Sequence, residues 1–408
     1  MAFSYSQAVS FLEGLKTPEK WTLARMRLLL KKAGIDFSRL RFVHVTGSNG
    51  KGSVCAMLYS ILRAQGESVG VYTSPHLCDW RERFLLDGAL VSQKEFARLA
   101  EKIKPAVIET RASQFEALTA MALLWFSKRN PDWVVWEVGL GGRLDATNVV
   151  DARFAAIMPI SLEHTDRLGE SVKKIAWEKS KIIKRGACVV TSNSGVALGE
   201  VKRECENQKA RLVMAKKPAG ITCTKTGAAF RYAGKAFRTS LLGFHQAENA
   251  AVAIELAREM GVRDKAVAKG LANAKWPGRL QVFCRKPLVV LDGAHNPAGV
   301  NALAKSFPKI FGAKPVLVVG IMNDKDWPAM ARTLCRLKPS LVIAAQPAGE
   351  RSLNAEILSR EFCRLGANAF AEKSVKSALG IAMEKALAEK KAVLVCGSLY
   401  TVGEVLQG

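Results

Sequence analysis

The sequence has no pair of cysteines at the C-x-x-C spacing, and its nine cysteines are scattered singly along 408 residues. An odd, unclustered set argues against a disulfide framework and a structural zinc site, and predicts reduced thiols. Long apolar runs are missing too: the longest, at residues 117–126, is about half of the roughly 18 residues that a membrane-spanning helix needs. The first twenty residues lack the basic start and apolar run of a secretory leader, so we expect a cytoplasmic protein with no membrane partner.

Acidic residues are scarce relative to basic ones. The 36 Asp and Glu residues face 61 Lys and Arg residues, which leaves a net charge of +25. Such an excess favours polyanionic partners, either nucleic acid or small substrates that carry phosphates and carboxylates. Because the cations are spread along the chain without a dense block, a general basic bias of the composition explains the excess equally well.

The chain is too long for one ordinary domain and is apolar enough to bury sizeable cores. Short β-branched runs alternate with stretches of helical periodicity, which predicts an α/β fold with a mostly parallel sheet wrapped by helices. The pattern restarts near residue 285. We therefore expect a large α/β domain at residues 1–284, of the P-loop ATPase type for the reason given below, and a smaller Rossmann-like α/β domain at residues 285–408.

Individual elements can be placed from these patterns. Strands are expected at residues 41–46, 69–72, 133–138, 155–160, 288–291, 315–320, 340–345 and 392–397. Helices are expected at residues 97–108, 116–129 and 247–259. Residues 214–242 are punctuated by glycine and predict a patch of antiparallel hairpins.

The stretch VTGSNGKGS at residues 45–53 follows a predicted strand and opens an amphipathic helix, which is the setting of a phosphate-binding loop. Its register departs from G-x-x-x-x-G-K-[ST], because Val45 stands where the first glycine belongs and Gly52 separates Lys51 from Ser53. Backbone N–H groups, the helix N-terminus and the Lys51 ammonium all attract phosphate. The helix is expected to stop at Gly66. An ordinary glycine turn is the alternative interpretation of the loop.

Acidic and imidazole side chains follow several of the predicted strands. Glu137 ends the apolar run WVVWE, where an acid beside a phosphate loop is placed to hold Mg²⁺ directly or through water. A strand-end carboxylate with a purely structural role is the alternative. Of the five histidines, His44 lies within a strand and is interpreted as packing. The other four lie in polar loops or at strand ends and suggest a site: His76, His164, His245 and His295.

A series of motifs extends over nearly the whole chain. They include VTGSNGKGS (45–53), TSPHL (73–77), FEALT (115–119), EVGLGGRLDATN (137–148), EHTDRLG (163–169), EKSKIIK (178–184), GFHQAENA (243–250), WPGR (276–279), LDGAHNP (291–297), GIMNDKD (320–326) and CGSLYTVG (396–403). In this order and spacing the sequence resembles the folylpolyglutamate synthase/dihydrofolate synthase family of the Mur ligase superfamily. The off-register loop resembles the Mur-type variant G-[ST]-N-G-K-G-[ST].

This resemblance implies an ATP-dependent ligase that adds L-glutamate to dihydropteroate, to reduced folates or to both. In the family a carboxylate is phosphorylated by ATP, and the amine of glutamate then displaces the phosphate. The implied partners are ATP, Mg²⁺, glutamate and the pteroate or folate acceptor, with no nucleic acid. The family also suggests a monomer.

The resemblance also assigns roles to residues. The implied ATP-binding residues are Gly47, Ser48, Asn49, Gly50, Lys51, Gly52, Ser53, Asn249, Arg279, Asp292 and His295. The implied Mg²⁺ ligands are Ser74, Glu137 and His164. The residues that match the pterin- or folate-facing region are Phe115, Glu116, Arg143, Leu144 and Asp145. The implied catalytic residues are Lys51, Lys179 and His164.

Lys179 matches the family lysine that is carbamylated by CO₂, although by spacing alone it is an ordinary helix lysine. Three departures from the family pattern stand out. Lys181 replaces a usual glycine, and Glu163 replaces the Asp that commonly precedes the metal-ligand histidine. The segment KWTLARMR at residues 20–27 keeps only Leu23 and Arg25 of the family stretch that contacts dihydropteroate.

Two alternatives remain open at the level of sequence. Another Mur-type amino-acid ligase would lack the SPHL and EVGLGGRLDATN segments. A basic nucleic-acid-binding ATPase would be expected to interleave cations with aromatic residues, and only 7% of the residues are aromatic.

Overall fold

The computed structural model describes residues 3–16, 21–312 and 314–408, and within these ranges the chain divides into two compact units. The first unit contains residues 1–217 and 249–274, and the second contains residues 218–248 and 275–408. The expected domain boundary after residue 284 remains a prediction. Residues 218–248 and 275–284 pack with the C-terminal residues and belong to the second unit. Lys20 of the segment KWTLARMR lies outside the described residues.

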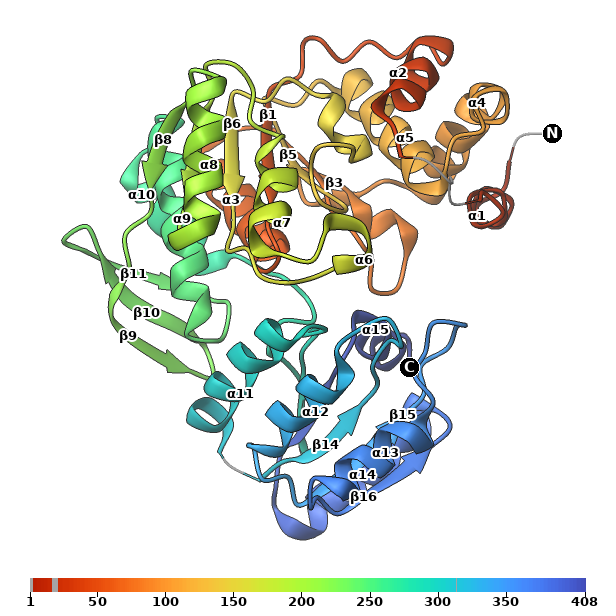
Figure 1. Ribbon diagram of the computed structural model, residues 1–408, viewed down its shortest axis with the longest axis vertical. Helices are drawn as coiled ribbons and strands as arrows, with labels where there is room; N and C mark the ends of the chain where they lie inside the picture. The colour runs from red at the N-terminus through yellow and green to blue at the C-terminus, as the bar shows by residue number, and fades with distance from the viewer. Residues whose placement is uncertain (1–2, 17–20, 313) are drawn as a thin grey trace. The chain divides into compact units, whose positions relative to one another are not determined.

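The first unit is built on an eight-stranded sheet (Figure 1). Its strands, in spatial order, are β4 (Ala89–Leu90), β3 (Phe84–Leu86), β2 (Val69–Tyr72), β5 (Trp133–Glu137), β1 (Phe42–Thr46), β6 (Phe154–Ile157), β7 (Cys188–Thr191) and β8 (Arg211–Met214). The six strands from β2 to β8 are parallel, and only β3 and β4 pair antiparallel. The expected α/β architecture with a mostly parallel sheet is therefore confirmed.

Helices surround this sheet. They are α1 (Tyr5–Glu13), α2 (Leu23–Lys32), α3 (Lys51–Gln65), α4 (Gln93–Thr110), α5 (Gln114–Arg129), α6 (Thr165–Leu168), α7 (Val172–Ser180), α8 (Gly195–Asn207), α10 (Asp264–Asn273) and most of α9 (His245–Glu259), with 3₁₀ turns η1 (Trp80–Arg83) and η2 (Ala146–Val149). One buried cluster joins α1, α2, α4 and α5 to strand residues such as Phe42 and Trp136. A second joins β6 and β7 to α8.

Helix α3 shows how the sequence positions the candidate site. It begins after Gly50, whose φ of +88° is left-handed, and ends at Gly66, whose φ of +102° confirms the expected stop. Glycine adopts this backbone without the penalty that a Cβ adds. The predicted apolar face is buried at Val54, Met57, Leu58, Ile61 and Leu62. Burial of that face fixes the helix against the sheet, so its N-terminus stays at the carboxyl end of β1.

The second unit contains two sheets. A three-stranded antiparallel sheet is formed by β9 (Ala219–Thr224), β10 (Gly227–Tyr232) and β11 (Lys235–Thr239), as the hairpin pattern predicted. A six-stranded sheet has the order β12 (Gln281–Arg285), β13 (Leu288–Leu291), β17 (Val393–Cys396), β14 (Val316–Val319), β15 (Leu341–Ala345) and β16 (Ala369–Glu372). Only β12 is antiparallel to its neighbour. The helices of this unit are α11 (Pro297–Phe311), α12 (Trp327–Cys335), α13 (Ala355–Arg364), α14 (Val375–Glu389) and α15 (Leu399–Gln407) (Figure 1).

Among the described residues, no helix combines the length and the apolar character that a bilayer crossing requires.

Candidate active site

The glycine loop lies between β1 and α3 and is tightly enclosed. A Cβ added at Gly47, where φ is +145°, would lie 2.4 Å from the Cβ of Met158. A Cβ added at Gly50 would lie 2.5 Å from the Oδ1 of Asn249. Both positions therefore require glycine. Asn249, about 200 positions further along the chain, lies directly over the loop. Its role in ATP binding remains a prediction.

Two ammonium groups meet at one backbone oxygen of this loop. The Nζ of Lys51 donates to the Gly47 carbonyl at 2.9 Å, and the Nζ of Lys179 donates to the same oxygen at 3.1 Å. Lys179 comes from α7 and is almost completely buried, with 2% of its side chain exposed. Its Nζ also lies 2.9 Å from the Oε1 of Glu163. The fold thus places two predicted catalytic residues and one carboxylate at the start of the phosphate loop.

The pKa values in this cluster reflect burial and charge together. Burial opposes the charge of Glu163, but Lys179 and Lys51 outweigh it and hold the pKa of the carboxyl at about 2. Burial lowers the pKa of Lys179; Glu163 opposes this shift, while Lys51 adds to it. We expect an ion pair between Glu163 and Lys179 at neutral pH, with an ammonium group that gives up its proton more easily than an exposed lysine does.

Ser48 fixes the course of the loop. Its backbone N–H donates to the Pro159 carbonyl at 3.0 Å, its hydroxyl donates to the Ser161 carbonyl at 3.1 Å, and it accepts from the Ser161 N–H at 3.0 Å. The loop is therefore held against residues 159–161, the segment that leads to Glu163 and His164. Asn49, Gly52 and Ser53 complete the loop and the first turn of α3, and Ser53 is buried.

Two of the three predicted metal ligands are in contact. The Ser74 N–H donates to the Oε2 of Glu137 at 3.0 Å, and the Glu137 side chain is buried at the carboxyl end of β5. His164 is half-buried and begins the short helix α6 with a left-handed φ of +47°. Within the described ranges, no group of three or more His, Cys, Asp or Glu side chains is arranged to hold a metal ion. The oxygens at Ser74 and Glu137 fit a Mg²⁺ ion that takes its remaining ligands from phosphate and water.

The predicted acceptor residues fall into two arrangements. The Phe115 ring packs on Gly139, where an added Cβ would lie 2.4 Å from the ring, and the same Cβ would lie 3.1 Å from the Oδ2 of Asp145. Glu116 instead serves the local structure: its Oε2 accepts from the Ser113 hydroxyl at 2.7 Å, and both of its oxygens accept from the Arg25 Nε at about 3 Å. Arg25 of the divergent KWTLARMR segment thus anchors α2 to the start of α5.

Arg143 and Leu144 are half-buried on the loop after β5. The Arg143 guanidinium pairs with Glu178 at 3.0 Å and lies 5.0 Å from the centre of the Trp177 ring. Lys181, the departure from the family glycine, lies on the same ring at 5.3 Å and bonds Glu204 at 2.5 Å. Its φ of −68° is ordinary right-handed backbone, so this lysine ends α7 without strain.

The predicted residues of the second unit gather around Gly293. A Cβ at Gly293 would lie 2.4 Å from the Nη1 of Arg279. The buried Asp292 accepts from the N–H groups of Leu280 and Ala294, both at 2.9 Å, and burial raises the pKa of its carboxyl despite the nearby Arg279. The Nδ1 of His295 lies 2.9 Å from the Gly293 carbonyl oxygen. Arg279, Asp292 and His295 therefore form one local cluster.

Glu163 was not predicted to be a site residue, although its carboxylate pairs with Lys179. The available signal was its position next to His164 in the EHTD motif. The partner of Glu163, sixteen residues away on α7, could not be read from spacing.

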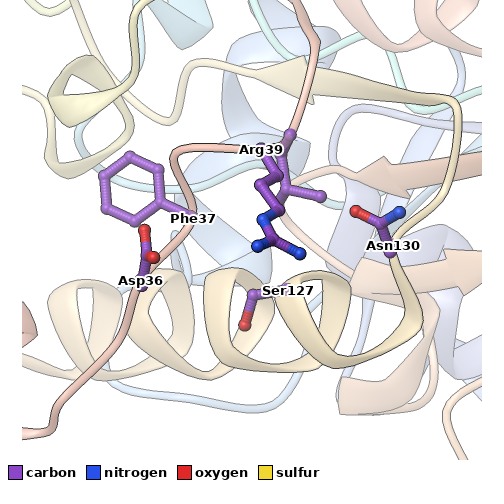
Figure 2. Close-up of a pocket in the computed structure, with 6 residues that line it drawn as sticks. Asp36, Phe37, Arg39, Ser127 and Asn130 are labelled. Carbon is purple, nitrogen blue, oxygen red and sulfur yellow. The ribbon is translucent and has the colours of Figure 1, made fainter.

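A pocket lies elsewhere on the first unit, between the segment that precedes β1 and the end of α5. It has a volume of about 190 Å³ and is lined by Asp36, Phe37, Arg39, Leu40, Ser127 and Asn130. Figure 2 shows the Arg39 guanidinium pointing toward Ser127 on the helix. None of the predicted site residues lines it.

Comparisons with known families match two stretches of the chain. Residues 45–257 match the Mur ligase middle domain, and residues 278–399 match the Mur ligase glutamate ligase domain. The first stretch begins at the glycine loop, and the second contains the cluster around Gly293.

Curated relatives share these segments. The chain is 40% identical over 420 residues to a probable bifunctional folylpolyglutamate synthase/dihydropteroate synthase of Halobacterium salinarum. The aligned region covers 98% of this chain and 51% of that protein. It thus spans about half the length of this relative and of a similar one from Haloferax volcanii. It is 32% identical to a dihydrofolate synthase/folylpolyglutamate synthase of Bacillus subtilis, over 99% of both chains.

Solved structures match over nearly the whole chain. A Mycobacterium tuberculosis folylpolyglutamate synthase complexed with ADP has a TM-score of 0.91 at 28% identity, covering 99% of this chain and 97% of that one. Escherichia coli FolC in complex with DHPP and ADP has a TM-score of 0.88 at 32% identity, covering 100% and 97%. A bifunctional folylpolyglutamate synthase/dihydrofolate synthase of Yersinia pestis, complexed with AMPPNP and a Mn ion, has a TM-score of 0.87 at 30% identity, covering 99% and 98%.

The enclosed glycine loop, the family matches and the full-length relatives agree with one another. This chain belongs to the folylpolyglutamate synthase/dihydrofolate synthase family of the Mur ligases.

Proposed function

We propose that this protein is an ATP-dependent amide ligase that adds L-glutamate to dihydropteroate, to reduced folates or to both. The observation that carries the proposal is the meeting of Lys51 and Lys179 at the Gly47 carbonyl, with Glu163 beside them. While Lys179 is unmodified, two ammonium groups and one carboxylate give the loop one net positive charge. That charge suits a reaction that must bring the phosphates of ATP close to a substrate carboxylate.

The proposed reaction has two steps. A carboxylate oxygen of the acceptor attacks the γ-phosphorus of ATP, the bond to the β-phosphate oxygen breaks, and ADP leaves. The amine nitrogen of glutamate then attacks the acyl carbon, the bond to the phosphate oxygen breaks, and the amine loses a proton as inorganic phosphate departs. Residues 47–53 would bind the phosphates through backbone N–H groups and Lys51, and Asn249 would contact the nucleotide from above the loop. Arg279, Asp292 and His295, which cluster within the second unit, are further proposed ATP-binding residues.

We propose Mg²⁺ as the divalent ion and Ser74, Glu137 and His164 as its protein ligands. When bound, this ion spreads the negative charge of the phosphates. Lys179 is the proposed site of carbamylation, in which its neutral amine adds CO₂ and releases a proton. Its lowered pKa favours that neutral amine. Phe115, Arg143 and Leu144 would face the acceptor. Glu116 and Asp145 would shape the acceptor site through their hydrogen bonds to neighbouring protein groups.

The test is phosphate release with ATP, Mg²⁺ and glutamate, run in parallel with 7,8-dihydropteroate and with tetrahydrofolate. We expect release with at least one acceptor, and each acceptor reports one of the two activities. Lys51→Ala should abolish release because it removes charge at the phosphates, whereas Lys94→Ala, on the exposed first turn of α4, should leave it unchanged.

Release with neither acceptor would refute the proposed acceptors. ATP hydrolysis that DNA stimulates and added salt suppresses would instead identify a nucleic-acid-binding ATPase. We further propose that the enzyme works as a cytoplasmic monomer on small-molecule substrates.

A further inference from the structure

Three buried polar side chains form a chain of hydrogen bonds between β1 and the loop that follows β5. His44 lies in the middle of β1 with no exposed surface, and its Nε2 lies 3.1 Å from the Oγ1 of Thr147. The Thr147 hydroxyl is in turn bonded to the carboxylate of Asp145, which also accepts the Thr147 N–H at 3.0 Å. The proposed function gives Asp145 a place in the acceptor site but leaves His44 and Thr147 without a role.

The direction of the hydrogen bonds follows from the donors that each group has. Burial raises the pKa of Asp145, while hydrogen bonds from Thr147 and from backbone N–H groups lower it and favour the ionised form. An ionised carboxylate only accepts, so Thr147 gives its single hydroxyl proton to Asp145 and accepts from His44. His44 is then the neutral imidazole with its proton on Nε2. Burial lowers its pKa to about 3, with a smaller effect from Lys184, so the ring stays neutral at physiological pH.

His44 is poorly suited to packing alone. Its Nδ1 is buried and has no hydrogen-bond partner among the described residues. Its neighbours on the strand, Val43 and Val45, are apolar and equally buried. Burying the Nδ1 atom without a partner is unfavourable. The hydrogen bond between the Nε2 atom and Thr147 is therefore the feature that accounts for a histidine at this position.

Asp145, at the other end of this series of hydrogen bonds, organises the loop after β5. The Oδ2 of Asp145 accepts from the Leu140 N–H at 2.8 Å, while its other oxygen holds Thr147, so the carboxylate closes residues 139–147 on themselves. A second bond ties the same loop to β1, since the Thr46 hydroxyl donates to the Gly141 carbonyl at 2.8 Å. The strand that ends in the phosphate loop therefore holds, at two points, the loop that carries Arg143 and Leu144.

We propose that His44 is a positioning residue for the acceptor substrate: through Thr147 it fixes the Asp145 carboxylate, and thereby the loop that presents Arg143 and Leu144. This inference rests on the proposed function, because it assumes that the 139–147 loop faces the acceptor. The phosphate-binding residues are held independently by Lys51, Ser48 and α3. Losing the His44 bond should therefore weaken acceptor binding and spare nucleotide binding.

Two substitutions of His44 separate this role from a structural one. The amide nitrogen of Gln reaches the position of Nε2, whereas that of Asn stops at the position of Nδ1. Both variants bury one amide, so both lose some stability. We expect His44→Asn to raise the KM for the acceptor about tenfold, the change that one hydrogen bond supports, and to leave the KM for ATP within about twofold. His44→Gln should restore the acceptor KM to near the wild-type value. Equal effects of Asn and Gln, or a parallel rise in both KM values, would overturn the inference.

Thr147 provides a second, independent pair of variants if the His44 variants fail to fold. Thr147→Val removes the hydroxyl and should raise the acceptor KM, whereas Thr147→Ser keeps it and should not. In a double-mutant cycle, the acceptor KM of the variant with both His44→Asn and Thr147→Val should be no higher than that of the more impaired single variant, because both substitutions break the same series of hydrogen bonds. Additive increases in the acceptor KM would contradict the inference.

A spectroscopic measurement keeps the inference distinct from the proposed function. The protein has five histidines, so long-range ¹H–¹⁵N spectra of histidine-labelled protein can be assigned by the signal lost in His44→Gln. We expect the His44 signal to be that of the Nε2–H tautomer, to persist to pH 5, and to change in Thr147→Val. A Nδ1–H tautomer would overturn the hydrogen-bond chain even if no acceptor is ever found. Failure of glutamate ligation with this signal intact would refute the function alone.

Discussion

The carbonyl oxygen of Gly47 accepts from two lysines that come from different helices. Two ammonium groups this close repel each other, and Glu163, with 9% of its side chain exposed, offsets only one of the charges. An anion that enters the loop would relieve the remaining repulsion. Removal of Glu163 would leave Lys179 buried without its carboxylate partner, which is among the more destabilising changes a buried ion pair can suffer.

At the same scale, Glu137→Gln tests the metal set. Glutamine keeps the shape of the side chain and loses its charge, so we expect the Mg²⁺ concentration for half-maximal ATP turnover to rise about tenfold or more. The matched control is Glu109→Gln, because the Glu109 side chain is 57% exposed on α4 and should leave the titration unchanged. An unaltered Mg²⁺ titration for Glu137→Gln would remove Glu137 from the metal site.

At the scale of elements, the loop after β5 packs directly on the end of α7. The Arg143 N–H donates to the Glu178 carbonyl at 2.9 Å. A Cβ at Gly142 would lie 2.7 Å from that carbonyl oxygen and 2.9 Å from the carbonyl oxygen of Lys179. The acceptor-side loop and the helix that carries Lys179 are thus in backbone contact, with no room for a side chain between them.

We expect Gly142→Ala to push this loop away from α7, to lower the free energy of unfolding by about 1–3 kcal/mol and to reduce ATP turnover. Gly199→Ala is the matched control: Gly199 lies inside α8 with no atom within 4 Å of an added Cβ, so alanine there should be neutral or stabilising by about 0.5–1 kcal/mol. Urea denaturation and phosphate release measure both effects. If Gly142→Ala is tolerated as well as Gly199→Ala, the close packing does not matter for function.

The sequence predicts an element best where local patterning and tertiary environment agree. The strands at Val69–Tyr72 and Leu288–Leu291 lie at the predicted residues, since each is a short β-branched run that becomes fully or largely buried. The strand predicted at residues 155–160 is Phe154–Ile157, and it stops before Pro159, which has no N–H for a ladder. The predicted helix at residues 97–108 extends to Gln93–Thr110 because Ser92 caps it.

In the candidate site, too, the sequence predicts features that depend on consecutive residues better than contacts between distant ones. The order of glycines and Lys51 predicts the phosphate loop, because that chemistry depends on consecutive residues. The pairing of Glu163 with Lys179 and of Arg25 with Glu116 depends on how distant elements pack, the latter across 91 positions. His44 was interpreted as packing, because a strand pattern records burial and not the partner that a buried ring meets.

At the scale of the whole molecule, the histidines affect acid stability. Burial lowers the pKa of His44 to about 3, that of His76 to about 4 and that of His245 to about 4. In the unfolded chain each would titrate near 6.5, so below that pH the unfolded state binds more protons than the folded state. Their contribution to stability is therefore fully present above about pH 6.5 and is lost as the pH falls toward 4.

We expect the free energy of unfolding, measured with urea, to fall between pH 7.5 and pH 5, with a contribution of about 2 kcal/mol from a fully buried imidazole such as His44. His44→Gln removes that titration and should flatten the pH dependence by the same amount, whatever it does to stability at pH 7.5. Parallel pH profiles for the wild type and His44→Gln would show that His44 does not control acid unfolding.

The chain passes between its two units at residues 217/218, 248/249 and 274/275. No single cut in the gene therefore yields two intact halves. A fragment that began at residue 285 would lack nearly all of β12, which covers the edge of β13, and would expose the backbone of an apolar strand to other chains. Such a fragment should aggregate when expressed alone. The glutamate-ligase half of this protein can therefore be studied in isolation only if the fragment also includes residues that precede residue 285.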